Sequence, residues 1–161
     1  MKGKDHLSTT QRSRNMARVS GQDTKPERLV RSYLHRRGFR FRKNVSSLPG
    51  KPDIVLPKYR TVIFVHGCFW HRHNCKRGQS IPTNRQEFWL AKFAKNVRRD
   101  EVVHEQLTVL GYRILVVWEC ELKKSMREQT LTRLATQLSD LPTSSSTSSA
   151  TSSGSVTTSS G

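Results

Sequence analysis

Two apolar segments separated by a long helix-forming segment constrain the fold of this chain most strongly. The segments Thr61–Val65 and Ile114–Trp118 are rich in β-branched and aromatic residues and predict strands. Between them, from about Asn84 to Leu110, apolar side chains recur near helical spacing, and Gly111 follows where the helix would end. This alternation of strand, helix and strand predicts an α/β fold.

A helix and two further strands are predicted before the first of these segments. Thr24 and Glu27 form a capping-box pattern that begins a helix, and Gly38 follows as a left-handed C-terminal cap. Short strand-like segments near Phe39–Arg42 and Asp53–Leu56 come next, separated by turns that contain proline and glycine. The order helix, three strands, helix, strand, helix predicts an α/β sandwich with a mixed central sheet flanked by helices.

The ends of the chain differ from this folded part. A chain of 161 residues is long enough for one domain and too short for two ordinary ones. We therefore expect a basic N-terminal arm over residues 1–23, a folded domain over residues 24–140 and a tail over residues 141–161. Within the arm, Thr10–Val19 could form a helix, although a short helix needs tertiary contacts or a ligand to persist. The tail consists mostly of serine and threonine without charge, and this composition predicts disorder.

The charge of the chain indicates its partner. Lysine and arginine number 29 against 12 acidic residues, which gives a formal net charge of +17. Such an excess is expected for a protein that binds a polyanion, and nucleic acid is the leading candidate. A ribosomal or tail-type basic protein is the alternative, but such proteins usually lack long apolar strands.

The apolar content and the cysteines indicate the compartment. No segment approaches the roughly 20 apolar residues that a membrane helix needs, and no signal-peptide pattern follows Met1. We therefore expect a cytoplasmic protein without a membrane partner. Three cysteines, an odd number in a reducing compartment, argue against a disulfide framework and leave metal ligation or buried thiols.

A metal-binding pattern lies directly after the strand that begins at Thr61. The sequence HGCFWHRHNC, at positions 66 to 75, holds two cysteines and three histidines in ten positions. Zn²⁺ prefers four nitrogen or sulfur ligands, and Cys68, His73 and Cys75 can supply three of them. Cys120, at the end of the next strand, supplies the fourth if the two strands lie side by side. We predict a structural zinc site, although the spacing matches no common zinc-finger pattern and unrelated reduced thiols are the alternative.

An acidic residue and two histidines form a possible catalytic set beside this pattern. Asp53 follows Pro52, which favours extended backbone, so its carboxylate lies at a rigid strand start and is a candidate metal ligand. His66 and His71 are not required by the zinc site and could act in acid and base catalysis. We favour His71 as general base, whereas His66 could equally be a surface or supporting histidine.

Two further acids lie on the two long predicted helices. Glu27 and Asp100 could hold metal-bound water. Each also has an adequate structural explanation, because Glu27 can serve as the capping-box partner and Asp100 as a solvated helix charge.

Six motifs taken together resemble one family. The motifs RSRNMARV, TKPERL, LPGKPD, VIFVHGCFWHRHNC, EFWLAKFAKNVRRD and VVWEC resemble those of the very short patch repair (Vsr) endonucleases in the same order, from about residue 9 to 125. The resemblance implies a restriction-endonuclease-like core in residues 24–140. It also implies a magnesium-dependent nick on the 5′ side of the mismatched thymine in a T·G pair, which initiates very short patch mismatch repair.

The resemblance also implies a role for each candidate residue. Asp53 and the main-chain carbonyl of Val65 would bind magnesium, and His71 would be the general base. The residues expected to orient metal-bound water or the phosphate are His66, Glu27 and Asp100. The zinc ligands would be Cys68, His73, Cys75 and Cys120.

Aromatic side chains acquire a role only through the resemblance. Phe69, Trp70 and Trp89 match side chains that wedge into DNA beside the mismatch from the major groove, and Met16 lies on an N-terminal helix that approaches the minor groove. Apolar wedges unstack a base step, which costs least where pairing is already imperfect. Without the resemblance, core packing would be the preferred explanation for Phe69 and Trp70, and a place on the apolar stripe of its helix for Trp89.

The sequence departs from the usual restriction-type nuclease pattern at one place. The acid-x-lysine pair of restriction-type nucleases is absent after Asp53, so histidine would do part of the work of lysine. We expect a bacterial monomer that acts on double-stranded DNA and is nucleoid-associated when bound, with MutL as a possible partner. The rivals are a non-catalytic zinc-containing DNA-binding protein and a homing or restriction nuclease for matched DNA.

Overall fold

The structure is a computed structural model, and it describes residues 8, 10, 11, 14 and 21–140. The predicted arm helix therefore lies largely outside the described residues, as do Met16 and the tail. In the described part the elements are α2 Lys25–Arg36, β1 Arg42–Lys43, β2 Ile54–Leu56, η1 Pro57–Tyr59, β3 Thr61–His66, α3 Lys76–Gln79, α4 Gln86–Val109, β4 Arg113–Trp118, η2 Glu119–Leu122 and α5 Arg127–Ser139. None of the described helices is long and apolar enough to cross a membrane.

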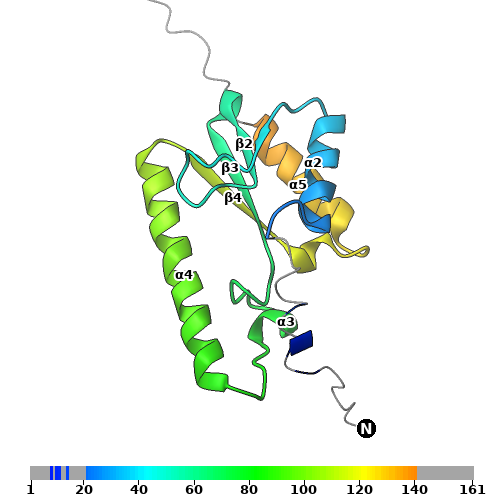
Figure 1. Cartoon of the computed structure of the whole chain (residues 1–161). Coiled ribbons are helices and arrows are strands. Elements are labelled where there is room, and N and C mark those ends of the chain that lie inside the picture. Colours follow the sequence, from blue (N-terminus) through cyan, green and yellow to red (C-terminus); the bar gives the residue numbers. More distant parts are fainter. Residues whose placement is uncertain (1–7, 9, 12–13, 15–20, 141–161) are drawn as a thin grey trace, which may run out of the picture.

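The sheet is mixed, as predicted, and lies between two layers of helices. Its strand order is β1-β2-β3-β4, in which β1 and β2 are antiparallel, β2 and β3 are antiparallel, and β3 and β4 are parallel. Helix α4 covers one face, and α2 and α5 cover the other (Figure 1). The larger core cluster joins α2, α5 and the sheet, whereas a smaller cluster of Val55, Val62, Phe64 and Leu107 lies beneath α4. The α/β sandwich is therefore confirmed.

Helix α2 begins as the capping box predicts, with one difference. The hydroxyl of Thr24 accepts a hydrogen bond from the amide of Glu27 at 3.4 Å. The carboxylate of Glu27 reaches back one residue further than expected and accepts the amide of Asp23 at 2.8 Å. At the other end Gly38 has a φ of +86°, so the left-handed cap is also confirmed.

Strand β1 is shorter and later than predicted. Only Arg42 and Lys43 pair with β2, opposite Val55 and Ile54. Phe39 is instead drawn into the core, where its ring lies 5.5 Å from that of Tyr59. Burial of this aromatic ring therefore takes the start of the predicted strand out of the sheet.

Helix α4 returns the chain so that β4 lies parallel to β3. Their register runs from Thr61↔Arg113 to His66↔Trp118. The guanidinium of Arg60 donates hydrogen bonds to the carbonyls of Leu110 at 2.7 Å and Gly111 at 3.3 Å, so it caps the end of α4. The parallel pairing brings the ends of β3 and β4 to one edge of the sheet, where both metal-binding patterns lie.

Candidate active site and cysteine cluster

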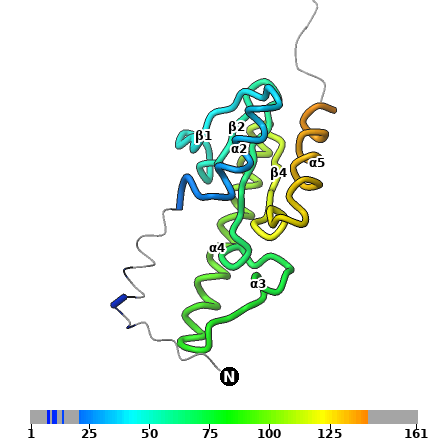
Figure 2. Tube along the Cα trace, turned by 90° about the vertical axis from the view of Figure 1, so that its right-hand side faces the viewer, coloured from blue at the N-terminus to red at the C-terminus, as the bar shows by residue number. Residues whose placement is uncertain are grey.

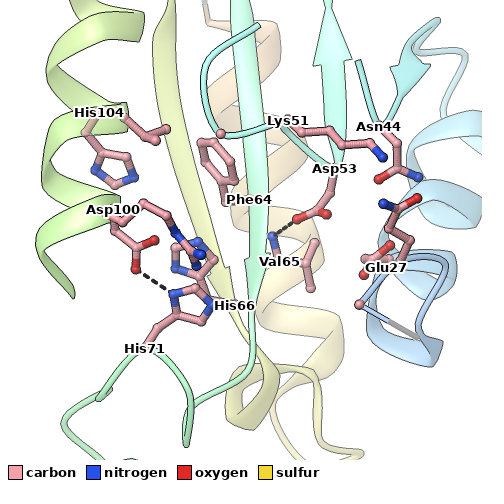
Figure 3. A pocket seen from close by; sticks show the side chains of 15 residues that line it. Glu27, Asn44, Lys51, Asp53, Phe64, Val65, His66, His71, Asp100 and His104 are labelled. Atoms are coloured by element: carbon pink, nitrogen blue, oxygen red, sulfur yellow. Dashed lines mark hydrogen bonds and ion pairs between the residues drawn. The ribbon is translucent and has the colours of Figure 1, made fainter. Parts of the chain in front are cut away.

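A pocket of about 240 Å³ opens at the carboxyl end of β3. Its lining includes Val65 and all five side chains that are proposed for catalysis. These five are Glu27, Asp53, His66, His71 and Asp100. They come from α2, the residue before β2, the end of β3, the following loop and α4. Figure 3 shows Asp53 and Glu27 on one flank of the pocket and His71 and Asp100 on the other. Residues separated by up to 73 positions (100 − 27) thus meet at one cavity.

Asp53 is held by the backbone of the next strand. Its Oδ2 accepts a hydrogen bond from the amide of Val65 at 2.8 Å. Burial raises the pKa of the Asp53 carboxyl from 3.8 to about 6, the hydrogen bond from Val65 opposes this rise, and the negative charge of Glu27 adds to it. A carboxylate in this position would be favoured by a bound cation.

The backbone of Val65 is left open on the side of Asp53. The ladder between β2 and β3 ends at Ile54↔Ile63, two residues before Val65. The amide of Val65 points toward Asp53, and in a strand the N–H and C=O of one residue point to the same edge. The carbonyl of Val65 therefore faces the Asp53 flank of the pocket, which gives two oxygen donors of the type that Mg²⁺ prefers.

His71 is oriented by Asp100. The Nδ1 atom of His71 lies 2.5 Å from Oδ2 of Asp100, and both side chains are largely buried. A carboxylate at Nδ1 fixes the ring orientation and leaves Nε2 as the nitrogen that can accept a proton. Asp100 therefore contacts a pocket histidine and is not simply a solvated charge on the helix surface.

His66 lies directly against His71. The two rings stack with centroids 3.8 Å apart and an interplanar angle of 7°. Burial and the neighbouring His71 lower the pKa of His66 to about 3, so the ring is neutral at physiological pH. Its Nδ1 is buried without a hydrogen-bond partner among the described residues. The stack holds the His71 ring in place, and the ligand atoms of His66, His71 and Asp100 all lie within 4.8 Å of one another, so these three side chains could also hold a metal ion.

Glu27 takes part in the capping of α2 and also lines the pocket. It is only 3% exposed, and its Oε1 accepts the hydroxyl of Thr24 at 2.8 Å. Arg31, also buried, forms ion pairs with Asp23 and Glu27. The capping box thus fixes an acidic group at the pocket edge.

Several pocket residues were missed by sequence reasoning, namely Gln22, Asn44, Lys51, Arg99 and His104. Lys51 and Asn44 lie beside Asp53 (Figure 3), and both have a φ of +50°, which is uncommon outside glycine. A lysine two residues before the aspartate was a visible signal, but its direction depends on this backbone conformation. His104 could have been found one helical turn after Asp100.

The four predicted zinc ligands come together in one cluster. Ligand atoms of Cys68, His73, Cys75 and Cys120 all lie within 4.8 Å of one another. Nδ1 of His73 is 3.3 Å from Sγ of Cys120. Two backbone amides donate to the sulfurs, that of Gly78 to Cys75 and that of Cys120 to Cys68, both at 3.4 Å.

The chemistry of these donors fits Zn²⁺. Burial raises the pKa of the Cys68 thiol to about 12, whereas the amide of Gly78 lowers the pKa of Cys75 to about 6. Three thiols and one imidazole at this separation form the Cys₃His set typical of structural zinc. Gly78 was missed, yet it is required here, because a Cβ at this position would lie 2.0 Å from the carbonyl oxygen of His73.

An aromatic cluster adjoins the cysteine loop. The ring of Phe69 lies 5.1 Å from that of Trp70 and 5.7 Å from that of Trp89, and the rings of Trp70 and Trp89 are 6.0 Å apart. All three are only partly buried. Phe93, by contrast, is 3% exposed, and its ring lies 5.0 Å from that of Phe69, so it joins the loop residue to α4. The ammonium group of Lys92 lies over both tryptophan rings, 5.2 and 5.6 Å from their centroids.

Comparison with known proteins identifies the family. Residues 4–77 match the family described as DNA mismatch endonuclease Vsr. A type II nicking enzyme of Neisseria meningitidis serogroup A is 47% identical over 137 residues, which are 84% of this chain and 97% of the relative. The DNA mismatch endonuclease Vsr of Escherichia coli is 46% identical over 123 residues, which are 75% of this chain and 78% of the relative.

A type II nicking enzyme of Xanthomonas oryzae adds a third match, with 48% identity over 118 residues, which are 73% of this chain and 86% of the relative. Residues 4–77, which the family model matches, include Asp53 and His71 of the pocket and three of the four residues of the cysteine cluster. The chain therefore belongs to the Vsr family of DNA mismatch endonucleases and is an endodeoxyribonuclease.

Proposed function

We propose that this protein nicks DNA on the 5′ side of the mismatched thymine in a T·G pair, with Mg²⁺ in the pocket, and so initiates very short patch repair. The observation that carries the proposal is the pocket itself, which unites an aspartate, an open backbone carbonyl and a carboxylate-oriented histidine. The names of the relatives, a mismatch endonuclease and nicking enzymes, support the reaction. The mixed sheet between helices supports a restriction-endonuclease-like core.

Asp53 and the carbonyl of Val65 would hold the magnesium ion. Their oxygen donors suit a hard cation, and a bound cation would offset the cost of the burial that raises the pKa of Asp53. When bound, Mg²⁺ offsets negative charge at the scissile phosphate and lowers the pKa of coordinated water.

His71 is the general base in this proposal. With Nδ1 facing Asp100, its Nε2 accepts the proton of the attacking water, and Asp100 stabilises the imidazolium that results. His66 remains neutral and holds the His71 ring in place by stacking. Glu27 retains oxygen lone pairs with which it can accept hydrogen bonds from water in the pocket.

The cysteine cluster and the aromatic cluster have separate tasks. Zinc at Cys68, His73, Cys75 and Cys120 would hold the loop that carries His71. Phe69, Trp70 and Trp89 would wedge into the DNA beside the mismatch, because they are partly exposed, and the rings of Phe69 and Trp89 pack against buried Phe93. Met16 would contribute from the N-terminal arm. We expect a monomer in a bacterial cytoplasm, with MutL as a possible accessory protein.

A nicking assay tests the proposed reaction. Two duplexes of identical flanking sequence, one with a T·G pair and one with T·A, are incubated with enzyme and Mg²⁺ over a panel of flanking sequences. We expect nicking only of the T·G duplex, and a loss of roughly 10²-fold or more for Asp53→Ala with DNA binding retained. Equal nicking of both duplexes would favour a nuclease for matched DNA, and nicking by neither would favour a non-catalytic DNA-binding protein.

Substitution of Lys51 provides a second test in the same nicking assay. We propose that its ammonium group neutralises the scissile phosphate, because it lines the pocket beside Asp53. Since φ is +50° at this position, Lys51→Gly removes the amine without backbone strain and should lower kcat roughly 10-fold to 100-fold while leaving Tm unchanged or higher. Lys51→Arg should restore most of kcat. A glycine variant with wild-type kcat would remove Lys51 from the mechanism.

A further inference from the structure

We propose that the protein has a second DNA-contact surface outside the catalytic pocket, which binds the phosphate backbone of the duplex flank. It consists of Arg36, Arg37, Arg40, Arg42 and Lys43, named here the basic strip. The inference rests on the proposed function only in taking duplex DNA as the ligand.

The charge around the basic strip is one-sided. From residue 28 to residue 52 the sequence contains eight lysines and arginines and no acidic residue. All five strip residues are exposed. Among the residues that the structure describes, none of the five forms an ion pair with an acidic side chain, whereas the buried Arg31 of the same segment forms two. Five exposed cations within eight consecutive positions suit a polyanion.

The backbone directs this charge outward. Phe39 is buried and Phe41 packs against the core, whereas Arg40 and Arg42 between and after them are exposed. This alternation places the two guanidinium groups on the same solvent face, with their Cα atoms roughly 6.6 Å apart if the segment is extended. The two phenylalanines thus anchor a rigid base for the charges.

The basic strip is continuous with the pocket. Lys43 pairs with Ile54, immediately after Asp53, and Asn44, the next residue after Lys43, lines the pocket. Figure 3 shows Asn44 on the flank opposite His71, whose loop carries two of the aromatic wedge residues. Figure 2 shows β1 at the opposite side of the molecule from α5. A duplex that crosses the pocket from the aromatic cluster therefore continues toward the strip.

Structural explanations account for only part of this charge. Arg42 and Lys43 could protect the edge strand from pairing with another chain, and Arg36 lies in the last turn of α2, where cations suit the helix dipole. Arg37 lies over the ring of Tyr33 at 5.1 Å. Arg40 has none of these roles, so it and its neighbour Arg42 are the most informative positions.

Binding measurements test the basic strip. Arg40→Gln with Arg42→Gln is compared with Lys123→Gln with Lys124→Gln, a control pair of exposed lysines with the same change in charge. Affinity for a T·G duplex is measured without Mg²⁺ over a range of KCl concentrations. If both arginines contact phosphates, the slope of log affinity against log salt should fall by about 2 for the strip variant, and by less than 1 for the control.

Duplex length provides the second measurement. Lengthening the duplex on one side of the mismatch should strengthen wild-type binding and leave the strip variant unaffected, whereas lengthening the other side should affect both proteins equally. An unchanged salt slope, or an equal fall in the control variant, would overturn the proposal. Failure of the proposed function would look different, because wild-type protein would then show no preference for nicking T·G duplexes while the strip variant still showed the altered slope.

Discussion

Burial of the ionised Asp53 carboxylate lowers the stability of the folded protein at neutral pH. A carboxyl whose pKa rises from 3.8 to about 6 is more easily kept neutral in the folded state than in the unfolded state. The contribution of this group to stability is therefore fully present below about pH 4 and is lost as the pH rises through about 6. Such a cost at neutral pH is expected of a residue that is retained for chemistry.

Asp53→Asn should therefore stabilise the metal-free protein while abolishing nicking. At pH 7.5 we expect a gain of roughly 1–3 kcal/mol, because two pKa units correspond to at most about 3 kcal/mol and Asn can still accept the hydrogen bond from Val65. Thermal unfolding at pH 7.5 and pH 4 measures this, and the gain should vanish at the lower pH.

Added Mg²⁺ provides the control for this variant. It should raise the Tm of the wild-type protein at pH 7.5 and leave Asp53→Asn unchanged, since the variant lacks the charged ligand. An Asp53→Asn protein that is less stable than wild type, or one that Mg²⁺ stabilises equally, would contradict the role given to this residue.

At the scale of elements, the loop between β3 and α4 depends on the cysteine cluster. Only the four-residue helix α3 gives regular structure to this loop, and its N-terminus is capped by the sulfur of Cys75. Arg77 adds an ion pair with Glu119, which follows β4, but both groups are partly exposed. The position of His71 therefore depends on the cluster more than on local helix or strand propensity.

Removal of zinc should release this loop before the sheet unfolds. We expect one zinc ion per chain by elemental analysis, and Cys68→Ser should lose it with a fall in Tm of roughly 10 °C or more. Hydrogen exchange should increase first in the loop that follows His66, while β3 and β4 remain protected. Asp53→Asn is the matched control and should retain zinc. Purified wild-type protein without stoichiometric zinc would refute the assignment.

The elements differ in how well the sequence predicts them, for physical reasons. Helix α2, helix α4 and strands β3 and β4 have strong periodicity or caps, and all four are found within two residues or so of their predicted ends. Strand β1 was displaced because burial of Phe39, a tertiary effect, outweighed local propensity. Helix α3 and the two 3-10 turns are too short to leave a periodic signal.

The residues of the candidate site also differ in how well the sequence predicts them. The cysteine cluster was predictable because zinc ligand chemistry is restrictive, and parallel pairing of β3 and β4 then brings Cys120 to the loop. The pairing of His71 with Asp100 joins two elements, and neither the spacing of the residues nor the resemblance predicted it. The directions of Lys51 and Asn44 depend on a left-handed backbone conformation that one sequence does not reveal, whereas the helical spacing of His104 from Asp100 was available as a signal.

At the scale of the whole molecule, α5 is the last element in the described part of the chain. Leu138 is fully buried in the core cluster, and the helix ends one residue later, at Ser139. The final 21 residues (161 − 140) lie outside the described part and contain no charged side chain. We therefore propose that the folded unit ends near Asp140.

A chain that stops at Asp140 tests this boundary. Its Tm should lie within about 1 °C of the full-length value, and its nicking rate should remain within about twofold, because every core side chain in the described part of the chain is retained. A chain that stops at Thr130 instead removes most of α5 and should fail to fold. A marked loss of nicking in the chain ending at Asp140 would give the tail a function.

The early end of the ladder between β2 and β3 has a consequence for sequence variation. Because the oxygen at position 65 belongs to the main chain, every amino acid supplies it, so the side chain there is free to drift among residues that suit the neighbouring core. Proline is the exception, since it lacks the N–H that Asp53 accepts. A position that appears variable among relatives can thus belong to the reaction centre, and variability there is no sign of dispensability.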